Sequence, residues 1–305
     1  MTAIAGQDLA RIVFGCGNFG GMGSSPALRA HGDGRAQALA LLDHARALGV
    51  TRFDTANTYG GGASERFLGE WLAGQDAAFR ACIEVATKVG NPHGCPPDER
   101  PLSGAQIAFH LDRSLRRLGV ERIGLYYLHE FDATTPLEET LAALERALAA
   151  GKIAAFGVSN AALADLEAVL RLAGDGALRA AFTHVQNEFS LVAQRDLANV
   201  IPLAAANGLS YVAFSPLAGG LLTGKYRPGE PAAPGSRLSS APDYYAHLLT
   251  PATFAAIGAL AARAAEAAVT PAAAALRFVL ETPGVAALII APRALAQFDA
   301  YGIAP

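Results

Sequence analysis

The sequence predicts a closed barrel of eight parallel strands with helices between them. Two observations predict it. Short, continuously apolar runs alternate with alanine-rich segments of helical spacing along the whole 305-residue chain, and most runs end in a polar residue. Continuous apolar runs indicate strands covered on both faces, and a repeated strand–helix unit indicates parallel β/α architecture. We expect residues 1–305 to form a single domain of this kind.

The apolar runs are the expected strands, and the expected helices lie between them. The runs cover 11–15, 51–55, 82–88, 123–129, 153–160, 182–188, 209–216 and 285–291. Apolar residues at helical spacing predict helices over 35–49, 64–73, 104–119, 137–152, 163–174 and 198–208. Several of these segments end in glycine, as helices often do: Gly49, Gly119, Gly151 and Gly208.

An open, doubly wound sheet that binds a dinucleotide is the competing architecture. The segment GCGNFG (15–20) follows the first run and matches G-x-G-x-x-G. In that fingerprint the last glycine lies in the helix that holds the pyrophosphate. Here the glycine-rich segment GMGSSPALRAHGDG (21–34) comes before any helix can start. The motif therefore fails its structural test, and the barrel is favoured.

Composition excludes several classes of protein. The net charge is −3 and there is no run of lysines and arginines, so nucleic acid is not an expected partner. No segment reaches the roughly 18 apolar residues of a membrane span, and the N-terminus lacks the features of a signal peptide. Cys16, Cys82 and Cys95 are widely spaced, which argues against a disulfide framework and against a metal site. We expect a cytoplasmic protein without a metal; the sequence does not predict its oligomeric state.

Polar residues close the expected strands. In an eight-stranded barrel these ends surround one mouth, where the active sites of this fold lie. A convergence of hydrogen-bonding and charged groups on one rim predicts a site there. The residues are Asp54, Lys88, His129, Ser159 with Asn160, Gln186, Ser215, and Arg293 just past the last run.

One loop adds a phenol to this rim, because Tyr59 follows Asp54 in the segment DTANTYGG (54–61). A phenol has an ordinary pKa near 10, and the adjacent ammonium of Lys88 is expected to lower it. Asp54 would keep Lys88 charged, and His129 could orient a carbonyl or relay a proton. This set suits protonation of an oxygen while hydride is delivered to carbon.

Other chemistries have less support. A metal-dependent hydrolase or aldolase needs more His and carboxylate ligands at strand ends than Asp54 and His129 supply. A Schiff-base aldolase that uses Lys88 stays open as an alternative.

The chain resembles the aldo-keto reductases across nearly its whole length. The resemblance is carried by FDTANTYGGGASERFLGEWL, VATKVG, LYYLHEFD, GKIAAFGVSN, VQNEFSLV and FSPLAGGLLTGKY, in the family's order. It implies a (β/α)8 TIM barrel and NADPH-dependent reduction of an aldehyde or ketone, such as an aryl aldehyde, a keto sugar or a carbonyl of secondary metabolism. It assigns catalysis to Asp54, Tyr59, Lys88 and His129, with Tyr59 as the general acid. A non-catalytic nucleotide-binding partner subunit of the same fold stays open.

The resemblance also implies the residues that hold NADPH/NADP+. Besides Asp54, these are Gly17, Asn18, Phe19, Ser159, Asn160, Gln186, Ser215, Leu217, Gly219, Leu221, Lys225, Arg293 and Gln297. Specificity for NADPH over NADH is expected to rest largely on Arg293, whose guanidinium can bind the 2′-phosphate. Gln186 could equally be a strand-end amide that satisfies backbone groups. Tyr301 stands where the family has an asparagine, so the adenosine end is expected to be held more loosely.

Two long segments, 18–34 and 227–249, follow strands and are expected to be irregular loops over the rim. The second carries Tyr244 and Tyr245, which could pack on a substrate or anchor the loop. The expected substrate contacts are these two tyrosines together with Tyr59, His129 and Glu130.

Overall fold

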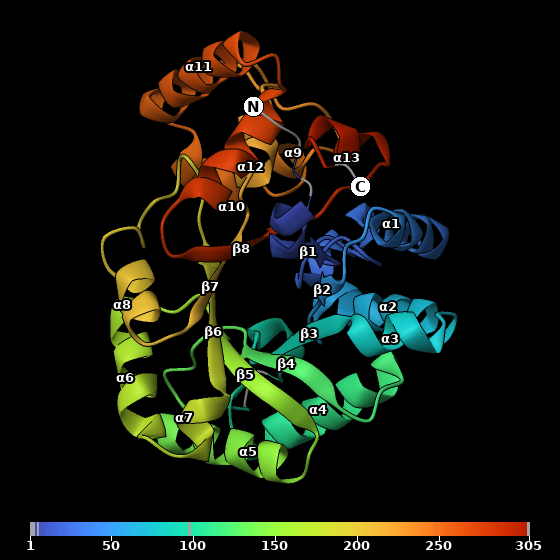
Figure 1. The fold of residues 1–305 in the computed structure, drawn as a ribbon, viewed down its shortest axis with the longest axis vertical. Coiled ribbons are helices and arrows are strands. Elements are labelled where there is room, and N and C mark those ends of the chain that lie inside the picture. Colours follow the sequence, from blue (N-terminus) through green and yellow to red (C-terminus); the bar gives the residue numbers. More distant parts are fainter. Residues whose placement is uncertain (1–3, 5, 97–98, 304–305) are drawn as a thin grey trace.

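The computed structural model describes residue 4, residues 6–96 and residues 99–303. Parallel strands β1 to β8 close into a barrel, in which each strand pairs with the next in sequence and β8 pairs with β1 (Figure 1). The predicted (β/α)8 barrel is confirmed, and the open doubly wound sheet is excluded. The strands are β1 Ile12–Gly15, β2 Arg52–Asp54, β3 Glu84–Val89, β4 Ile123–Leu128, β5 Ile153–Ser159, β6 Phe182–Glu188, β7 Ser210–Phe214 and β8 Val285–Ile290.

The runs are continuously apolar because each strand packs on two apolar layers. Outward-facing residues such as Phe53 and Tyr126 belong to the main core between the strands and the helices. Inward-facing residues such as Val13, Val212 and Ile289 fill the interior of the barrel.

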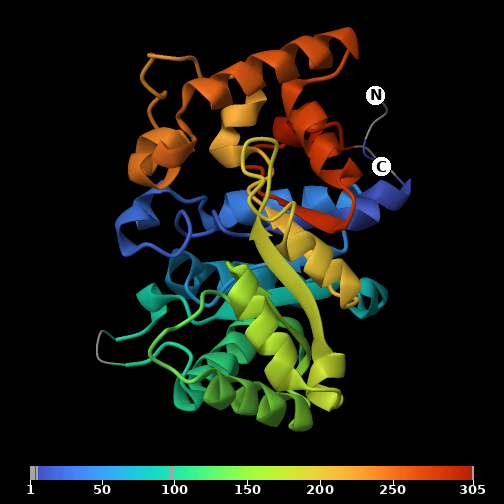
Figure 2. The ribbon, with the colours of Figure 1, turned by 90° about the vertical axis from the view of Figure 1, so that its left-hand side faces the viewer.

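The helices surround the strands (Figure 1), and the side view places α11 and α5 at opposite ends of the molecule (Figure 2). They are α1 Arg35–Ala47, α2 Ala63–Ala73, α3 Ala77–Cys82, α4 Gly104–Leu118, α5 Leu137–Ala149, α6 Leu163–Ala173, α7 Ala177–Ala181, α8 Val200–Ala206, α9 Arg237–Ser240, α10 Pro242–Tyr245, α11 Pro251–Glu266, α12 Pro271–Glu281 and α13 Ala296–Ala300. Each predicted helix is present. Cys82, predicted to begin the third strand, instead ends α3.

The glycines predicted at helix ends all have left-handed backbone conformations. Their φ values are 92° at Gly49, 66° at Gly119, 70° at Gly151 and 67° at Gly208. Glycine adopts this conformation at no steric cost, so it ends a helix and turns the chain toward the next strand.

Arg11, at the end of the 3-10 helix Gly6–Arg11, anchors that helix beside the start of β8. Its guanidinium donates to the carbonyls of Leu280 at 2.6 Å, Val285 at 2.8 Å and Ala286 at 3.1 Å. This 3-10 helix therefore lies at the amino-terminal end of the barrel, opposite the mouth that carries the predicted site.

The loops after β1 and β7 are less irregular than expected. Residues 26–31 form a 3-10 helix, and the segment 227–249 contains α9, α10 and a further 3-10 helix over 246–248. Ser236 caps α9 and Pro242 begins α10, which explains why a segment rich in Ser and Pro is helical here. The loops meet where Arg237 donates to Asn18 Oδ1 at 2.6 Å.

Within the described ranges, no single helix combines the length and apolar character needed to cross a membrane; one bent pair, 242–248 with 251–266, does so by length and composition only.

Candidate active site

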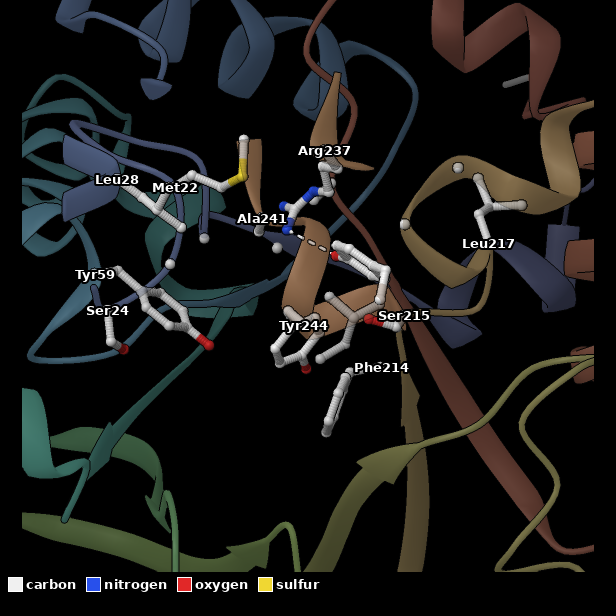
Figure 3. A pocket seen from close by; sticks show the side chains of 18 of the residues that line it. Met22, Ser24, Leu28, Tyr59, Phe214, Ser215, Leu217, Arg237, Ala241 and Tyr244 are labelled. Carbon is white, nitrogen blue, oxygen red and sulfur yellow. Dashed lines mark hydrogen bonds between the residues drawn. The ribbon is translucent and has the colours of Figure 1, made fainter. Parts of the chain in front are cut away.

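A cleft of about 1180 Å³ opens at the carboxyl ends of the strands. In Figure 3, Tyr59 points its hydroxyl into the middle of this cleft, with Met22, Ser24 and Leu28 beside it and Phe214, Ser215 and Tyr244 across from it. The strand-end residues Asp54, His129, Ser159, Asn160, Gln186 and Ser215 all line it. The structure thus brings the predicted rim residues to one place.

A buried ion pair lies at the base of the cleft. Lys88 Nζ donates to Asp54 Oδ1 and, at 3.0 Å, to the carbonyl of Thr55. Gln186 Nε2 donates to the second carboxylate oxygen of Asp54 at 2.9 Å. The side chains of Lys88 and Asp54 are only 1% and 5% exposed. Lys88 is thereby held in one position, with its third contact, at 3.5 Å, to the hydroxyl of Tyr59.

The electrostatics of this group differ in part from the expectation. Burial is the largest single influence on Lys88 and opposes its charge, but Asp54 and Tyr59 together outweigh it, so the pKa of Lys88 is raised. Burial also raises the pKa of Tyr59; the Lys88 ammonium acts to lower it but does not prevail. The expected lowering of the Tyr59 pKa is therefore not found. The desolvation of a phenol in the cleft outweighs one neighbouring cation, and the hydroxyl keeps its proton at neutral pH.

His129 completes the group around Tyr59. The two rings meet edge to face with centroids 5.5 Å apart. Burial, together with the Lys88 ammonium, lowers the pKa of His129 well below its ordinary value, so the imidazole is neutral. Among the described residues, Nδ1 of His129 has no hydrogen-bond partner. Asn160 holds the backbone here by donating to the His129 carbonyl at 2.9 Å.

Two features hold the loop that carries Tyr59. Gly60 has a φ of 56°, and a Cβ there would lie 2.4 Å from the Phe19 carbonyl oxygen, so only glycine fits. From the outside, Arg117 of α4 donates to the Asn57 carbonyl at 3.0 Å and pairs with the fully buried Glu65 at 2.9 Å. The tyrosine therefore stands on a supported turn.

The loop after β7 has an unusual backbone. Ser215 and Ala218 have φ values of 53° and 49°, and Gly219 and Gly220 also have positive φ. The N–H groups of Ala218 and Gly220 donate to the Ser215 carbonyl at 2.8 Å and the Leu217 carbonyl at 2.9 Å, which holds the turn in this shape. Lys225 lines the same part of the cleft.

The predicted cofactor residues divide into two sets. Gly17, Ser159, Asn160, Gln186, Ser215, Leu217, Gly219, Lys225, Arg293 and Gln297 line the cleft. Asn18, Phe19 and Leu221 are not among the described residues that line it, and neither is Lys88, which was predicted as a catalytic residue. Phe19 and Leu221 are fully buried in core clusters, Asn18 bonds Arg237, and Lys88 lies below the cleft floor.

The predicted substrate residues also differ from one another. Tyr244 lines the cleft and is 56% exposed, whereas Tyr245, also at the cleft, is only 2% exposed. Tyr245 packs so closely on Gly219 that a Cβ on that glycine would lie 2.5 Å from its ring. Glu130 is half-buried and accepts a hydrogen bond from Asn91 at 2.6 Å. Tyr245 is thus the anchor of its loop, and Tyr244 is the tyrosine open to a ligand.

Arg237 and Asp33 are among the cleft residues that the sequence analysis did not name. Arg237 enters the cleft from α9 (Figure 3). It donates to Asn18 at 2.6 Å and to the Tyr245 hydroxyl at 3.5 Å. Asp33 pairs with Arg293 at 2.9 Å. No local motif marks either residue, since each is defined by a contact between distant parts of the chain. No group of His, Cys, Asp and Glu within the described ranges is placed to hold a metal ion.

The comparisons with known proteins identify the family of this chain. The model of the aldo/keto reductase family matches residues 11–301, and the chain belongs to that family. It is 38% identical over 196 residues to Uncharacterized oxidoreductase YrpG of Bacillus subtilis, covering 62% of this chain and 60% of that protein.

Two further relatives carry more specific names. The chain is 32% identical over 207 residues to aldo-keto reductase yakc [NADP(+)] of Schizosaccharomyces pombe, covering 67% of this chain and 59% of that one. It is 34% identical over 194 residues to L-glyceraldehyde 3-phosphate reductase of Escherichia coli, covering 63% and 56%. The matched regions thus span 56% to 60% of these three relatives.

Proposed function

We propose that the protein reduces an aldehyde or ketone to an alcohol with NADPH, with Tyr59 as the proton donor. The observation that carries this proposal is the buried set of Asp54, Lys88 and Tyr59, in which a protonated phenol opens on the cleft 3.5 Å from a fixed ammonium. The relative named as NADP(+)-linked supports the cofactor. When bound, NADPH supplies hydride to the carbonyl carbon.

The side chains would then manage the carbonyl oxygen. Tyr59 and the neutral His129 donate hydrogen bonds to that oxygen, which polarises and orients the carbonyl. As negative charge develops on oxygen, the Tyr59 proton moves to it; an alkoxide is a stronger base than a phenolate, so transfer is downhill even though burial raises the pKa of Tyr59. The Lys88 ammonium stabilises the resulting phenolate, and Asp54 keeps Lys88 charged and in place.

The cleft can hold the nucleotide in a defined orientation. Ser159, Asn160 and Gln186 lie beside the catalytic group and would contact the nicotinamide end. The backbone at 215–220 with Lys225 would bind the pyrophosphate. Arg293 and Gln297, which follow β8, would reach the adenosine ribose. The remaining predicted contacts, Asn18, Phe19, Leu217, Gly219 and Leu221, would shape this wall directly or from behind it.

The substrate is proposed to be an uncharged carbonyl compound. Glu130 directly follows His129, lines the cleft, and is half-buried. A carboxylate in this position repels a substrate that carries its own carboxylate or phosphate, and it can accept a hydrogen bond from a substrate hydroxyl. Aryl aldehydes and keto sugars meet this condition.

The test is to supply NADPH with a panel of neutral and anionic aldehydes and ketones. Turnover is measured as the loss of the near-ultraviolet absorbance of NADPH. We expect turnover with neutral members and little with anionic ones. NADPH binding without turnover on any member would favour the non-catalytic nucleotide-binding subunit. Borohydride trapping of a substrate on Lys88 would favour the Schiff-base aldolase, for which this lysine would have to lose the proton that Asp54 holds on it.

A further inference from the structure

The end of the cleft assigned to adenosine contains an ion pair that the proposed function does not use. Arg293 donates from Nε to Asp33 Oδ1 at 2.9 Å and from Nη2 to the His31 carbonyl at 3.0 Å. Both Asp33 and Arg293 line the cleft. A guanidinium recognises phosphate through its charge and its paired donors. Here the chain already occupies one edge of that guanidinium and offsets its charge.

Asp33 is fixed in the wall. Its backbone N–H donates to the Asn18 carbonyl at 2.7 Å, and its own carbonyl accepts from the Gly20 N–H at 2.8 Å. Gly32, just before it, packs so tightly that a Cβ there would lie 2.0 Å from the Gly21 nitrogen. The side chain of Asp33 is 6% exposed. The backbone thus holds this nearly buried carboxylate next to Arg293.

Asp33 is a largely buried carboxylate that is paired with Arg293. Burial raises its pKa above the ordinary value, although Arg293 and Arg237 act to lower it. Its second oxygen, Oδ2, is buried without a hydrogen-bond partner among the described residues. An anion that approaches Arg293 therefore also approaches a carboxylate.

NAD and NADP differ at the 2′ position of the adenosine ribose, and Asp33 and Arg293 would interact differently with the two. In dinucleotide sites a carboxylate accepts a hydrogen bond from the ribose 2′-hydroxyl of NAD, whereas an arginine accommodates the 2′-phosphate of NADP. This cleft holds one carboxylate, that of Asp33, and one guanidinium, that of Arg293, in direct contact. A 2′-phosphate gains the attraction of Arg293 and loses much of it to the repulsion of Asp33.

We propose that Asp33 determines the cofactor discrimination of this protein: by offsetting Arg293 it lets NAD+ and NADP+ bind with comparable affinity. The proposal rests on the proposed function, since it places a nicotinamide nucleotide in the cleft. It changes the expectation drawn from Arg293 alone, in which the arginine gives strong preference for the phosphorylated cofactor.

Isothermal titration calorimetry with NADP+ and NAD+ tests the proposal by binding alone. The wild type is expected to bind the two within about fivefold of each other, and Asp33→Asn to favour NADP+ by about tenfold more than the wild type does. Asp112→Asn is the matched control: it removes the same charge from a surface pair with Lys152, whose side chains are 45% and 42% exposed, and should leave the ratio unchanged.

Thermal unfolding shows whether Asp33→Asn is folded. If it is not, a second variant still tests the proposal. Arg293→Met leaves the carboxylate alone and should shift the ratio toward NAD+ by about tenfold or more. If Asp33→Asn leaves the ratio unchanged or lowers it, Asp33 is a brace that orients Arg293, and the proposal is overturned. If the wild type binds neither nucleotide, the proposed function fails together with this inference; if it binds both and the ratio does not respond, only this inference fails.

Discussion

Replacement of Lys88 by methionine should separate the electrostatic role of the buried pair from its role in stability. The variant leaves the Asp54 carboxylate, 5% exposed, without its cation. Loss of one partner of a buried pair costs about 3–5 kcal/mol. Gln186 still donates to Asp54 at 2.9 Å, so we expect the lower end of that range, about 3 kcal/mol of unfolding free energy.

The double variant Asp54→Asn with Lys88→Met removes both charges. Because no uncompensated charge remains, its unfolding free energy should lie within about 1 kcal/mol of the wild-type value. Its carbonyl reduction should stay as low as that of Lys88→Met, about 100-fold below wild type, since no ammonium stabilises the phenolate of Tyr59.

Urea denaturation measures the unfolding free energy, and NADPH oxidation with a neutral aldehyde measures the rate of carbonyl reduction. A cost below about 1 kcal/mol for Lys88→Met would show that the pair is not desolvated as the structure indicates. Recovery of turnover in the double variant would refute the role of the ammonium. The pH profile of Lys88→Met adds a check. Lys88 acts to lower the pKa of Tyr59, so its loss should move the alkaline limb set by Tyr59 to higher pH.

Three further outcomes follow from other parts of the molecule. Burial, helped by Arg52, lowers the pKa of His184 to about 4. The folded protein favours the neutral ring, so this group costs no stability above the unfolded pKa of about 6.5 and destabilises the fold as the pH falls toward 4. His184→Gln should therefore reduce the acid loss of unfolding free energy by about 3 kcal/mol, and no reduction would count against the burial of this ring. Tyr244→Ala should change the order in which the aldehydes of the panel are preferred, with little effect on stability. Tyr245→Ala should lower stability by about 3 kcal/mol. A loss of stability with Tyr244→Ala and a changed preference with Tyr245→Ala would show that the two roles are reversed. Arg117→Met should lower both turnover and stability, the latter by about 3 kcal/mol, because it leaves Glu65 buried and releases the Asn57 carbonyl. The control Arg113→Met, on the same helix, removes a contact with the exposed ring of Phe109 and should change stability by less than about 0.5 kcal/mol. Equal effects of the two variants would contradict the support role of Arg117.

The barrel and the catalytic group were predictable because both depend on local sequence patterns, namely apolar runs and the polar residues that end them. Strand ends converge in any closed parallel barrel, so Asp54, Lys88 and His129 could be placed together from their positions at the ends of apolar runs. Helices α11 and α12 were not assigned, since alanine-rich segments such as 251–281 show little contrast between apolar and polar positions.

The parts that could not be predicted depend on contacts between distant segments. The pairs Arg237–Asn18 and Arg293–Asp33 join residues more than 200 positions apart, and no spacing in the sequence encodes them. The direction of the Tyr59 pKa failed for a related reason: the cation beside it was visible from the sequence, but the depth of its burial was not.

Tyr59→Phe tests the central claim, that this phenol gives its proton to the carbonyl oxygen, most directly. The substitution removes one hydroxyl and keeps the ring that packs edge to face on His129 at 5.5 Å. NADP+ affinity, measured by calorimetry, should stay within about threefold of wild type, and reduction of a neutral aldehyde should fall by about 100-fold or more. A variant that binds NADP+ normally and retains more than about a tenth of the wild-type turnover would show that another group is the acid.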